Sequence, residues 1–307
     1  MIQKSKYFRI SVTSHCNLSC FFCHREGNFT NRKDELSPRD FQTACRVALE
    51  CGFQKFKLTG GEPTLRNDIC EIVSKLSELN LPDFSMITNG TTLNQKAKSL
   101  WNAGLRRINV TLNTLNQNKF KQINNTDIPI SNILKGIEAA RNVGFRNIKL
   151  NFVYFDESSK QDFEDLISYI KGNDMTLVLL PVISNDIYYG LNDLYELLRV
   201  YEIDSEELVT DREGIQKRLI YLKSGAKILL RLDELAENRP YVFCQKCSNS
   251  KICREGIFPI RLSAQGELIA CMASLEHRIS IKNFLKSDDI DSIKDAFSKI
   301  DRWYSNG

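Results

Sequence analysis

Short runs of β-branched and aromatic residues alternate with longer amphipathic runs between residues 7 and 183. The short runs predict strands, and the longer runs, whose apolar positions recur every three or four residues, predict helices. The expected strands are residues 7–12, 55–58, 84–88, 107–112, 147–153 and 176–182. Because helical runs lie between these strands, the pattern is typical of parallel strands joined by crossover helices. We therefore expect an α/β fold, a partial (β/α)6 barrel of the TIM type.

Some element boundaries are marked by individual residues. The helix expected at residues 38–51 places Phe41 and Val47 on one face. Ser37 suits the N-cap of this helix, and Pro38 suits its first position. This start is therefore expected to be sharp.

The alternation becomes irregular after residue 183, and we place a domain boundary near Asn185. Residues 1–184 form the expected barrel, and residues 185–307 form a smaller C-terminal domain. No low-complexity linker separates the two parts, so we expect the second to pack directly on the barrel.

Charge is nearly balanced, with 42 basic and 38 acidic residues among 307 and a net charge of +4. The charges are spread along the chain, so no patch typical of nucleic-acid binding stands out, while small anionic substrates remain compatible. No stretch reaches the roughly 18 apolar residues that a membrane helix needs, and the N-terminus lacks the pattern of a signal peptide. We expect a cytoplasmic protein that binds neither nucleic acid nor membranes.

The chain contains ten cysteines. Because cytosolic thiols are kept reduced, this number favours metal or redox chemistry over disulfides. Seven of them form two groups, Cys16, Cys20 and Cys23 near the N-terminus and Cys244, Cys247, Cys253 and Cys271 near the C-terminus. The remaining three, Cys45, Cys51 and Cys70, stand alone in helix-like stretches, where we interpret them as buried apolar residues.

The first cysteine group forms a C-x3-C-x2-C loop directly after the first expected strand. Active sites of such barrels lie at this end of the strands. Three thiolates in one short loop can hold a four-iron cluster and leave one iron open to an external ligand. The alternative is a partial zinc site.

Polar and glycine-containing segments follow the next three strands. They are Thr59-Gly60-Gly61-Glu62, Thr88-Asn89-Gly90 and Thr111-Leu112-Asn113. Paired glycines allow backbone groups to approach a ligand closely. A barrel would gather all three segments around the cysteine loop.

The cysteine loop, with Phe22 before its last cysteine, resembles the signature of the radical S-adenosylmethionine (SAM) superfamily. The resemblance implies a 4Fe-4S cluster held by Cys16, Cys20 and Cys23, with SAM bound to the fourth iron. It also implies that one electron from the cluster cleaves SAM to a 5'-deoxyadenosyl radical, which abstracts hydrogen from a substrate. The SAM-binding residues that it implies are Thr59, Gly60, Gly61, Glu62, Thr88, Asn89, Thr111 and Asn113, although an acidic residue is more usual at the last position.

Longer stretches narrow the resemblance to the GTP 3',8-cyclase family of molybdenum-cofactor synthesis and extend it over nearly the whole chain. They are residues 8–13, 24–27, 58–66, 103–112, 123–125, 149–151 and 261–266. The resemblance implies substrate-binding roles for Arg9, Arg66 and Arg261, and the cationic side chain of Lys149 suits a phosphate group. Pro259 departs from the family, in which an arginine stands two residues before Arg261.

Cys244, Cys247 and Cys271 resemble the ligands of a second, auxiliary 4Fe-4S cluster in that family. Cys253 is an additional cysteine in this interval, and four thiolates would close the cluster to outside ligands. The alternative is a structural zinc site with four cysteine ligands, which the C-x2-C spacing permits.

Together these motifs predict two 4Fe-4S clusters and SAM as cofactors, a small anionic substrate, and an electron donor such as flavodoxin or ferredoxin. The first functional hypothesis is a GTP 3',8-cyclase-like enzyme acting on a nucleotide-like anion. Cys253 and Pro259 leave open a radical SAM enzyme that modifies a peptide or an antibiotic-type small molecule. A non-catalytic iron-sulfur or zinc scaffold is a third hypothesis, but it leaves the gathering of motifs at strand ends unexplained. The sequence identifies no catalytic side chain.

Overall fold

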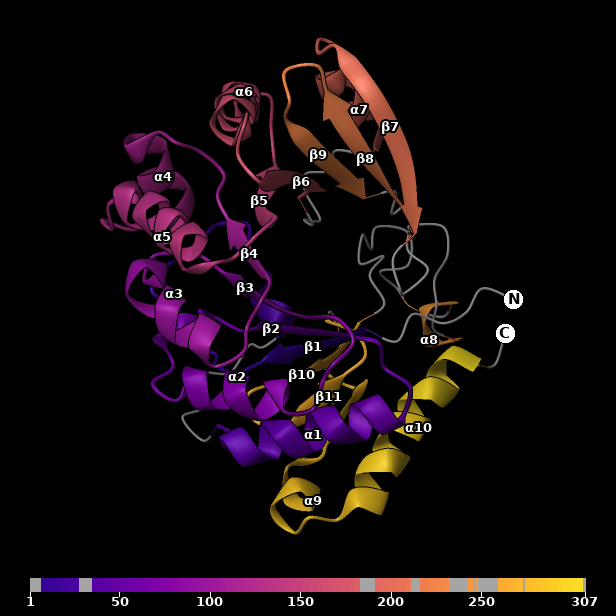
Figure 1. The fold of residues 1–307 in the computed structure, drawn as a ribbon. Helices are drawn as coiled ribbons and strands as arrows, with labels where there is room; N and C mark the ends of the chain where they lie inside the picture. Colours follow the sequence, from indigo (N-terminus) through magenta and orange to yellow (C-terminus); the bar gives the residue numbers. More distant parts are fainter. Residues whose placement is uncertain are drawn as a thin grey trace.

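The computed structural model describes residues 7–27, 35–182, 191–210, 216–231, 242–245, 247, 259–272 and 274–305. These residues form one sheet of twelve strands in the order β12-β11-β10-β1-β2-β3-β4-β5-β6-β9-β8-β7. The sheet curls into an open half-barrel with helices on its outer side (Figure 1).

The six predicted strands are confirmed, and their ends differ from the prediction by at most one residue. They are β1 (Tyr7–Ser11), β2 (Lys55–Thr59), β3 (Phe84–Thr88), β4 (Ile108–Thr111), β5 (Ile148–Tyr154) and β6 (Met175–Pro181), and neighbours in this series pair in parallel. The helices between them are α1 (Pro38–Glu50), α2 (Ile69–Ser77), α3 (Leu93–Asn102), α4 (Gln117–Asn124), α5 (Ile130–Val143) and α6 (Ser159–Ile170), with short 3-10 turns η1 (Arg25–Gly27) and η2 (Pro63–Leu65). The expected α/β half-barrel is therefore the observed fold.

Local signals explain where α1 begins. The Ser37 side chain accepts a hydrogen bond from the backbone N–H of Asp40, and the Asp40 carboxylate accepts one from the backbone N–H of Ser37. This capping box satisfies two amide groups that the helix itself leaves without partners. The predicted N-cap is confirmed.

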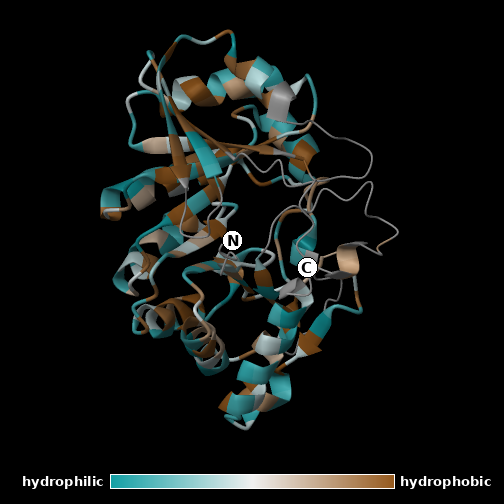
Figure 2. Ribbon diagram, turned by 90° about the vertical axis from the view of Figure 1, so that its right-hand side faces the viewer, coloured by the Kyte–Doolittle hydropathy of each residue, from teal (hydrophilic) through white to brown (hydrophobic). Residues whose placement is uncertain are grey.

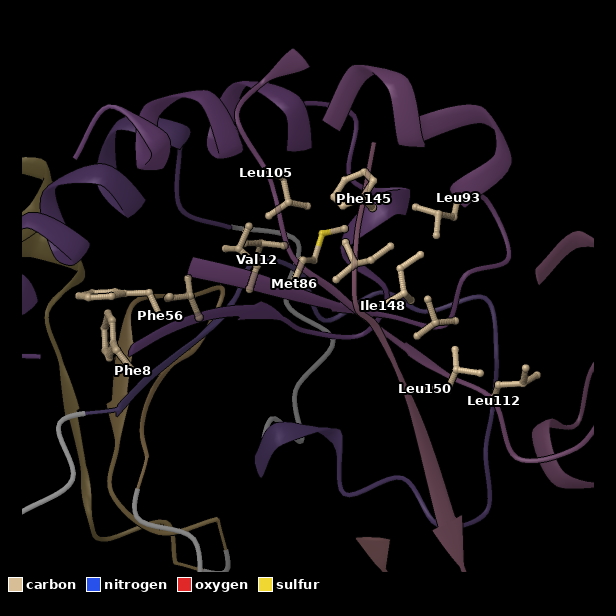
Figure 3. Close-up of a cluster of buried hydrophobic side chains, with 14 of the residues drawn as sticks. Phe8, Val12, Phe56, Met86, Leu93, Leu105, Leu112, Phe145, Ile148 and Leu150 are labelled. Carbon is tan, nitrogen blue, oxygen red and sulfur yellow. The ribbon is translucent and has the colours of Figure 1, made fainter. Parts of the chain in front are cut away.

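The main core lies between the sheet and its covering helices (Figure 3). Successive side chains of a strand point to opposite faces of a sheet. In β1, Phe8 and Ile10 are fully buried in this core, and in β2 the same holds for Phe56 and Leu58. The helices carry hydrophilic and hydrophobic residues side by side, as expected of elements with one covered face (Figure 2).

Strands from the C-terminal part of the chain extend the sheet at both ends. They are β7 (Ile203–Thr210), β8 (Gln216–Leu222), β9 (Lys227–Arg231), β10 (Ile260–Leu262), β11 (Glu267–Ile269) and β12 (Arg278–Ser280), accompanied by α7 (Leu191–Leu198), α8 (Val242–Gln245), α9 (Lys282–Lys286) and α10 (Ile290–Ser305). β9 pairs in parallel with β6, and β10 pairs in parallel with β1. The two parts thus share one sheet, and the domain boundary near Asn185 stays a prediction.

Helix α10 closes the outer side of the sheet near β1. The ring of Phe297 lies 5.5 Å from that of Phe8 and 5.4 Å from that of Phe53. Such edge-on and tilted arrangements are the favourable geometries for aromatic pairs. Among the described helices, none is both long and apolar enough to cross a membrane.

Candidate active site

The first cysteine group lies in the loop that leaves the C-terminal end of β1. Cys16 and Cys20 are half-buried, and Cys23 is exposed. Burial, together with the nearby Cys23 and Cys16 thiols, raises the pKa of Cys20 to about 12. The three thiols are therefore near enough to influence one another, but in this structure they do not lie close enough to hold a single metal ion together.

Backbone amides already point at two of these sulfurs. The N–H of Leu18 donates to Cys16 Sγ and that of Arg25 donates to Cys23 Sγ, both at 3.4 Å. The side-chain amide of Asn89 reaches Cys16 Sγ at 3.9 Å. The bonds from Leu18 and Asn89 lower the pKa of Cys16, but burial outweighs them and raises it overall.

The end of α4 clamps the cysteine loop from the other side. The backbone N–H groups of Ser19 and Phe21 donate to the carbonyls of Asn124 and Ile123, at 2.9 and 3.2 Å. The Cys20 thiol donates to the side-chain oxygen of Asn124 at 3.0 Å. The Ile123-Asn124-Asn125 stretch contributed to the family resemblance, but the sequence did not reveal that it holds the cysteine loop.

The glycine pair after β2 packs directly against the start of the cysteine loop. A Cβ at Gly60 would lie 2.4 Å from the Thr13 carbonyl oxygen, and one at Gly61 would lie 2.1 Å from that of His15. The N–H of Gly61 and the N–H of Glu62 donate to these two carbonyls at 2.8 Å. In this structure the close approach that requires glycine is therefore made to the protein's own backbone.

Glu62 joins the loops that follow β2 and β3. Its buried carboxylate accepts hydrogen bonds from the Thr64 backbone at 3.0 Å, the Thr88 hydroxyl at 2.7 Å and the Asn89 backbone at 2.6 Å. Burial raises the pKa of Glu62, while these donors oppose that rise. Asn89 in turn donates to the side chain of Asn17 at 2.9 Å, which ties both loops to the cysteine loop.

Asn113 extends the pairing between β4 and β5 beyond their last regular residues. Its side-chain oxygen accepts a hydrogen bond from the Val153 backbone at 2.8 Å. Thr111 lies opposite Asn151 in the same pair of strands. The structure thus brings all the sequence-predicted SAM residues to the strand ends that surround the cysteine loop.

Arg9 and Arg261 are neighbours in register on β1 and β10. Both donate to one carboxylate oxygen of Glu26, at 3.0 Å from Arg9 and 3.2 Å from Arg261. The Thr59 hydroxyl donates to the other oxygen at 3.1 Å, and Arg9 also donates to the Tyr7 hydroxyl at 2.9 Å. Glu26, which sequence reasoning did not single out, therefore lies between two residues expected to bind substrate.

The electrostatics of Glu26 follow from this arrangement. Burial alone would raise the pKa of its carboxyl group, but Arg9, His24 and Arg261 outweigh burial and hold that pKa well below its usual range. The carboxylate is charged under ordinary conditions.

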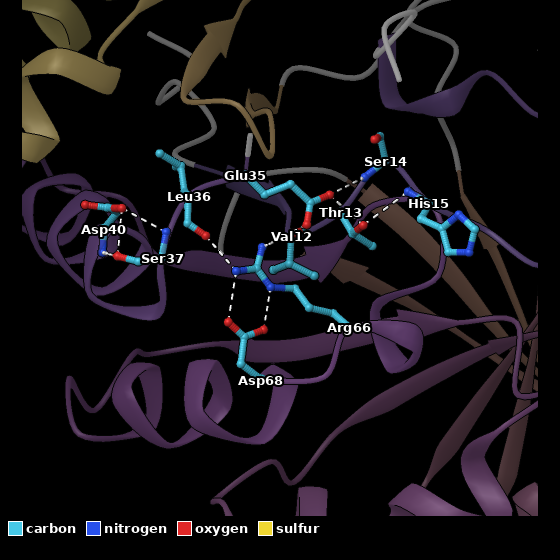
Figure 4. Close-up of polar contacts among 10 residues, drawn as sticks. All are labelled: Val12, Thr13, Ser14, His15, Glu35, Leu36, Ser37, Asp40, Arg66 and Asp68. Atoms are coloured by element: carbon cyan, nitrogen blue, oxygen red, sulfur yellow. Dashed lines mark hydrogen bonds and ion pairs between the residues drawn. The ribbon is translucent and has the colours of Figure 1, made fainter. Parts of the chain in front are cut away.

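Arg66, the third arginine expected to bind substrate, is engaged within the protein (Figure 4). It makes five hydrogen bonds, two to Asp68 and one each to the Val12 carbonyl, the Leu36 carbonyl and Glu35. A guanidinium has five N–H donors, so in this conformation none is left for a substrate. These contacts connect Val12 and residues 35–36 to Asp68, which precedes the first residue of α2.

A basic group lies on the inner face of the sheet. Lys57 is the register neighbour of Arg9, and Lys149 alternates with the core residues Ile148 and Leu150, so both point away from the core. The pKa of Lys57 is lowered by burial and, to a smaller extent, by Lys55, Arg9 and Lys149. The pKa of Lys149 is lowered to about 8 by burial and by the basic neighbours Arg107, Lys217 and Lys55. Asp83 raises the pKa of both lysines, but its effect is smaller than that of each basic neighbour named above.

The second cysteine group is described in part, because Cys253 lies outside the described residues. Cys244 belongs to α8, Cys247 follows it, and Cys271 follows β11. The N–H of Cys247 donates to the Cys244 carbonyl at 3.2 Å, the same turn that the N–H of Cys23 makes with the Cys20 carbonyl. Both C-x2-C pairs are therefore closed by the same backbone hydrogen bond between their two cysteines.

An aromatic contact joins the two elements that carry these cysteines. Phe243 of α8 stacks on His277 of the β11–β12 connection, with ring centroids 3.5 Å apart. In the described parts of the chain, no three His, Cys, Asp or Glu side chains lie close enough to hold a single metal ion. The choice between a cluster and zinc at this group stays open.

Comparison with known proteins identifies the superfamily. Residues 10–170 match the radical SAM superfamily. The chain belongs to this superfamily. The chain is therefore an enzyme, and its superfamily implies that it uses SAM and a 4Fe-4S cluster.

Curated relatives show which members of the superfamily the chain is similar to. The chain is 31% identical over 282 residues to the probable GTP 3',8-cyclase of Pyrococcus abyssi, with 89% of both chains covered. It is 32% identical over 285 residues to the probable GTP 3',8-cyclase of Sulfolobus acidocaldarius, with 91% of this chain and 85% of that one covered. The resemblance to GTP 3',8-cyclases noted in the sequence is therefore confirmed.

Solved structures show the same fold at low sequence identity. Streptococcus suis SuiB bound to the precursor peptide SuiA has a TM-score of 0.65 and 19% identity, and the match covers 99% of this chain and 65% of SuiB. Native anSMEcpe with bound AdoMet has a TM-score of 0.61 and 15% identity, over 97% of this chain and 84% of that one. These likenesses confirm the half-barrel fold of radical SAM enzymes.

The residues of the first cysteine loop fit a cluster. Three cysteines follow β1 in one short loop, Cys16 and Cys23 influence the pKa of Cys20, and the sulfurs of Cys16 and Cys23 already accept backbone N–H groups. The loop is held by the Gly60-Gly61 backbone on one side and by α4 on the other. Three thiolate ligands would leave one iron of a 4Fe-4S cluster without a protein ligand.

Proposed function

We propose that the chain is a radical SAM enzyme of the GTP 3',8-cyclase type that acts on a nucleoside triphosphate or a closely similar polyanion. The observation that carries this proposal is the basic inner face of the half-barrel, where Lys57 and Lys149 both point away from the core and Lys149 is one of the basic neighbours that lower the pKa of Lys57. The relatives of 31% and 32% identity support the same activity.

The first step is assigned to the cysteine loop. Cys16, Cys20 and Cys23 would hold a 4Fe-4S cluster that, with SAM bound, supplies a 5'-deoxyadenosyl radical able to take a hydrogen atom from the substrate. The protein's part is to orient that radical and the target C–H bond and to exclude water. The loop is suited to this because backbone hydrogen bonds hold it to the Gly61-Glu62 segment on one side and to the end of α4 on the other.

The SAM-binding residues fall into two kinds by their contacts. Thr59, Gly60, Gly61, Thr88, Asn89 and Thr111 line the strand ends around the cysteine loop, where we propose that they contact SAM. The side chains of Thr59, Thr88 and Asn89 bond other side chains, whereas Glu62 and Asn113 accept backbone N–H groups from the segments after β3 and on β5. We therefore propose that Glu62 and Asn113 act mainly by shaping the loops.

The lysines are proposed to bind the phosphates. An ammonium group gains a charge-assisted hydrogen bond when it meets a phosphate oxygen, and like-charged neighbours gain further because their repulsion is relieved. Lys149 remains largely protonated near neutral pH, since its pKa is about 8. The inner face therefore favours a substrate with several negative charges.

The second cysteine group is proposed to hold an auxiliary 4Fe-4S cluster. Cys244, Cys247 and Cys271 supply three thiolates, and the sequence offers Cys253 as a fourth. The shared C-x2-C turn supports the same kind of group at both sites.

A second candidate function is the modification of a peptide. The fold similarity to SuiB, which was solved with its precursor peptide, favours it. Such a substrate would not need the basic inner face, so we rank this function second.

The deciding experiment is an anaerobic assay of 5'-deoxyadenosine release by the reconstituted enzyme. GTP, the other nucleoside triphosphates, inorganic tripolyphosphate and candidate peptides would be compared. We expect GTP or another triphosphate to stimulate release at least tenfold, and Lys149→Ala to raise the KM for that nucleotide by about tenfold. Lys98→Ala, a surface change on α3, is the matched control and should behave like the parent. Stimulation by a peptide alone would transfer the assignment to the second function.

A further inference from the structure

The contact between Cys20 and Asn124 has the opposite direction to the contact between Cys16 and Asn89. The Cys20 thiol donates to the side-chain oxygen of Asn124 at 3.0 Å, whereas the side-chain nitrogen of Asn89 donates to Cys16 Sγ at 3.9 Å. An asparagine amide has an oxygen that accepts and a nitrogen that donates, so its two ends suit a thiol and a thiolate respectively. In this structure Asn124 presents the end that suits a cysteine still carrying its hydrogen.

Asn124 is held firmly at the residue where α4 ends. Its side-chain nitrogen donates to the Phe120 carbonyl at 2.9 Å, and its own carbonyl accepts the backbone N–H of Ser19 at 2.9 Å. The residue is only 5% exposed, and Asn125 after it adopts the left-handed conformation that is common at the end of a helix. The amide of Asn124 is therefore buried against the cysteine loop, with both of its ends already engaged.

The backbone of α4 holds the loop separately from this amide. The N–H of Ser19 donates to the Asn124 carbonyl and that of Phe21 donates to the Ile123 carbonyl at 3.2 Å. Both are main-chain bonds, so a substitution of the Asn124 side chain does not remove their donors or acceptors. The amide can therefore have a role of its own toward the Cys20 sulfur, and a side chain of similar size can test that role.

We propose that Asn124 is a positioning residue that exchanges the two ends of its amide when Cys20 binds iron and then donates a hydrogen bond to the Cys20 sulfur. An iron-bound sulfur has no hydrogen to donate, so in the observed orientation the amide oxygen would face a negatively charged sulfur. The exchange gives up the bond to Phe120 and gains a charge-assisted one, which is roughly twice as strong as a neutral hydrogen bond.

The expected consequence is a higher reduction potential of the cluster. Hydrogen bonds to the sulfurs are among the factors that set this potential. The reduced cluster carries one more negative charge than the oxidised one, so a donor beside Cys20 stabilises the reduced form more. The inference rests on the proposed function, because it assumes that Cys16, Cys20 and Cys23 hold the cluster that cleaves SAM.

The test is an anaerobic redox titration of the reconstituted enzyme, followed by the electron paramagnetic resonance signal that SAM perturbs. We expect Asn124→Leu to keep its iron and to shift the reduction equilibrium about tenfold toward the oxidised cluster, a fall of about 59 mV for one electron. Asn124→Asp should shift it further in the same direction, because a carboxylate then lies beside Cys20. Asn118→Leu, a change of an exposed residue on the same helix, is the matched control and should keep the parent's potential.

Two results would overturn the inference. One is a purely structural effect, in which Asn124→Leu loses iron and melting temperature while the remaining cluster keeps the parent's potential. The other is a rise in potential, which would show that the amide oxygen faces the sulfur in the loaded enzyme. If Asn124→Leu does not fold, a parent-like potential in Asn124→Asp serves as the overturning result.

Cys20→Ala separates these outcomes from a failure of the proposed function. If Cys20→Ala retains the SAM-perturbed signal, the assignment of the cluster to this loop is wrong, and the inference fails with it. If Cys20→Ala loses the signal while both Asn124 variants keep the parent's potential, the inference alone is wrong.

Discussion

Arg9 and Arg261 lie directly opposite each other on adjacent parallel strands and bond the same oxygen of Glu26. This contact connects the first strand of the half-barrel, the loop that carries the cysteines and a strand from the end of the chain.

Loss of one thiolate from the first loop should abolish SAM cleavage. We expect Cys20→Ala to release no detectable 5'-deoxyadenosine, because two protein ligands cannot fix an open four-iron cluster. Cys70→Ala, which changes an isolated half-buried cysteine of α2, should retain activity and iron. Continued 5'-deoxyadenosine release by reconstituted Cys20→Ala would contradict the assignment of the loop.

A methyl group at Gly61 should displace the cysteine loop. Its Cβ would lie 2.1 Å from the His15 carbonyl oxygen, so Gly61→Ala should destabilise the protein by about 3 kcal/mol and reduce bound iron. Gly52→Ala has φ of +87° but open space around its Cβ, so it should cost only about 1 kcal/mol of backbone strain and keep its iron. Guanidinium unfolding and iron analysis would measure both effects, and equal behaviour of the two variants would refute the role of Gly61.

Anion binding should weaken as the pH rises past about 8. Burial and basic neighbours lower the pKa of Lys149 from its usual value to about 8, so in the folded protein its charge is present below that pH and lost above it. Tripolyphosphate affinity, titrated from pH 6.5 to 9.5, should fall in this window for the parent. Lys149→Arg should lack the step because a guanidinium stays charged. An identical pH profile for both proteins would show that Lys149 does not contact the anion.

Arg66 should matter for stability more than for substrate affinity. Removing its five hydrogen bonds in Arg66→Ala leaves two carbonyls and two carboxylates without their donor, and we expect a loss of about 3 to 5 kcal/mol. Arg46→Ala, which removes an exposed ion pair with Glu50 on α1, should cost less than about 1 kcal/mol. Thermal unfolding gives the first quantity and nucleotide titration the second. If Arg66→Ala lost nucleotide affinity strongly while its stability stayed unchanged, Arg66 would be a substrate-binding residue.

The second cysteine group should account for about half of the iron. We expect Cys271→Ala to lower the reconstituted enzyme from about eight to about four irons per chain, because one of two 4Fe-4S clusters is lost. Cluster content would be followed by iron and sulfide analysis and by electron paramagnetic resonance. One zinc per chain in the parent would establish the zinc alternative.

The sequence by itself determined the local features of this protein. Strand and helix positions follow from the period of apolar residues, and the start of α1 follows from Ser37 and Pro38, which are adjacent in the sequence. The spacing of Cys16, Cys20 and Cys23 and the glycine pair after β2 were equally readable, because each motif lies in one short segment.

Only the tertiary structure decided which distant residues meet. β10 joins β1 although most of the chain separates them, and this pairing alone brings Arg261 to Arg9. Glu26 reaches both arginines from η1, and Arg66 uses its donors on Asp68, Glu35 and two backbone carbonyls that are distant in the sequence or separated from it by a loop. Periodicity and spacing describe residues that are neighbours along the chain. The partners of an arginine side chain depend on which distant strands and loops pack beside it.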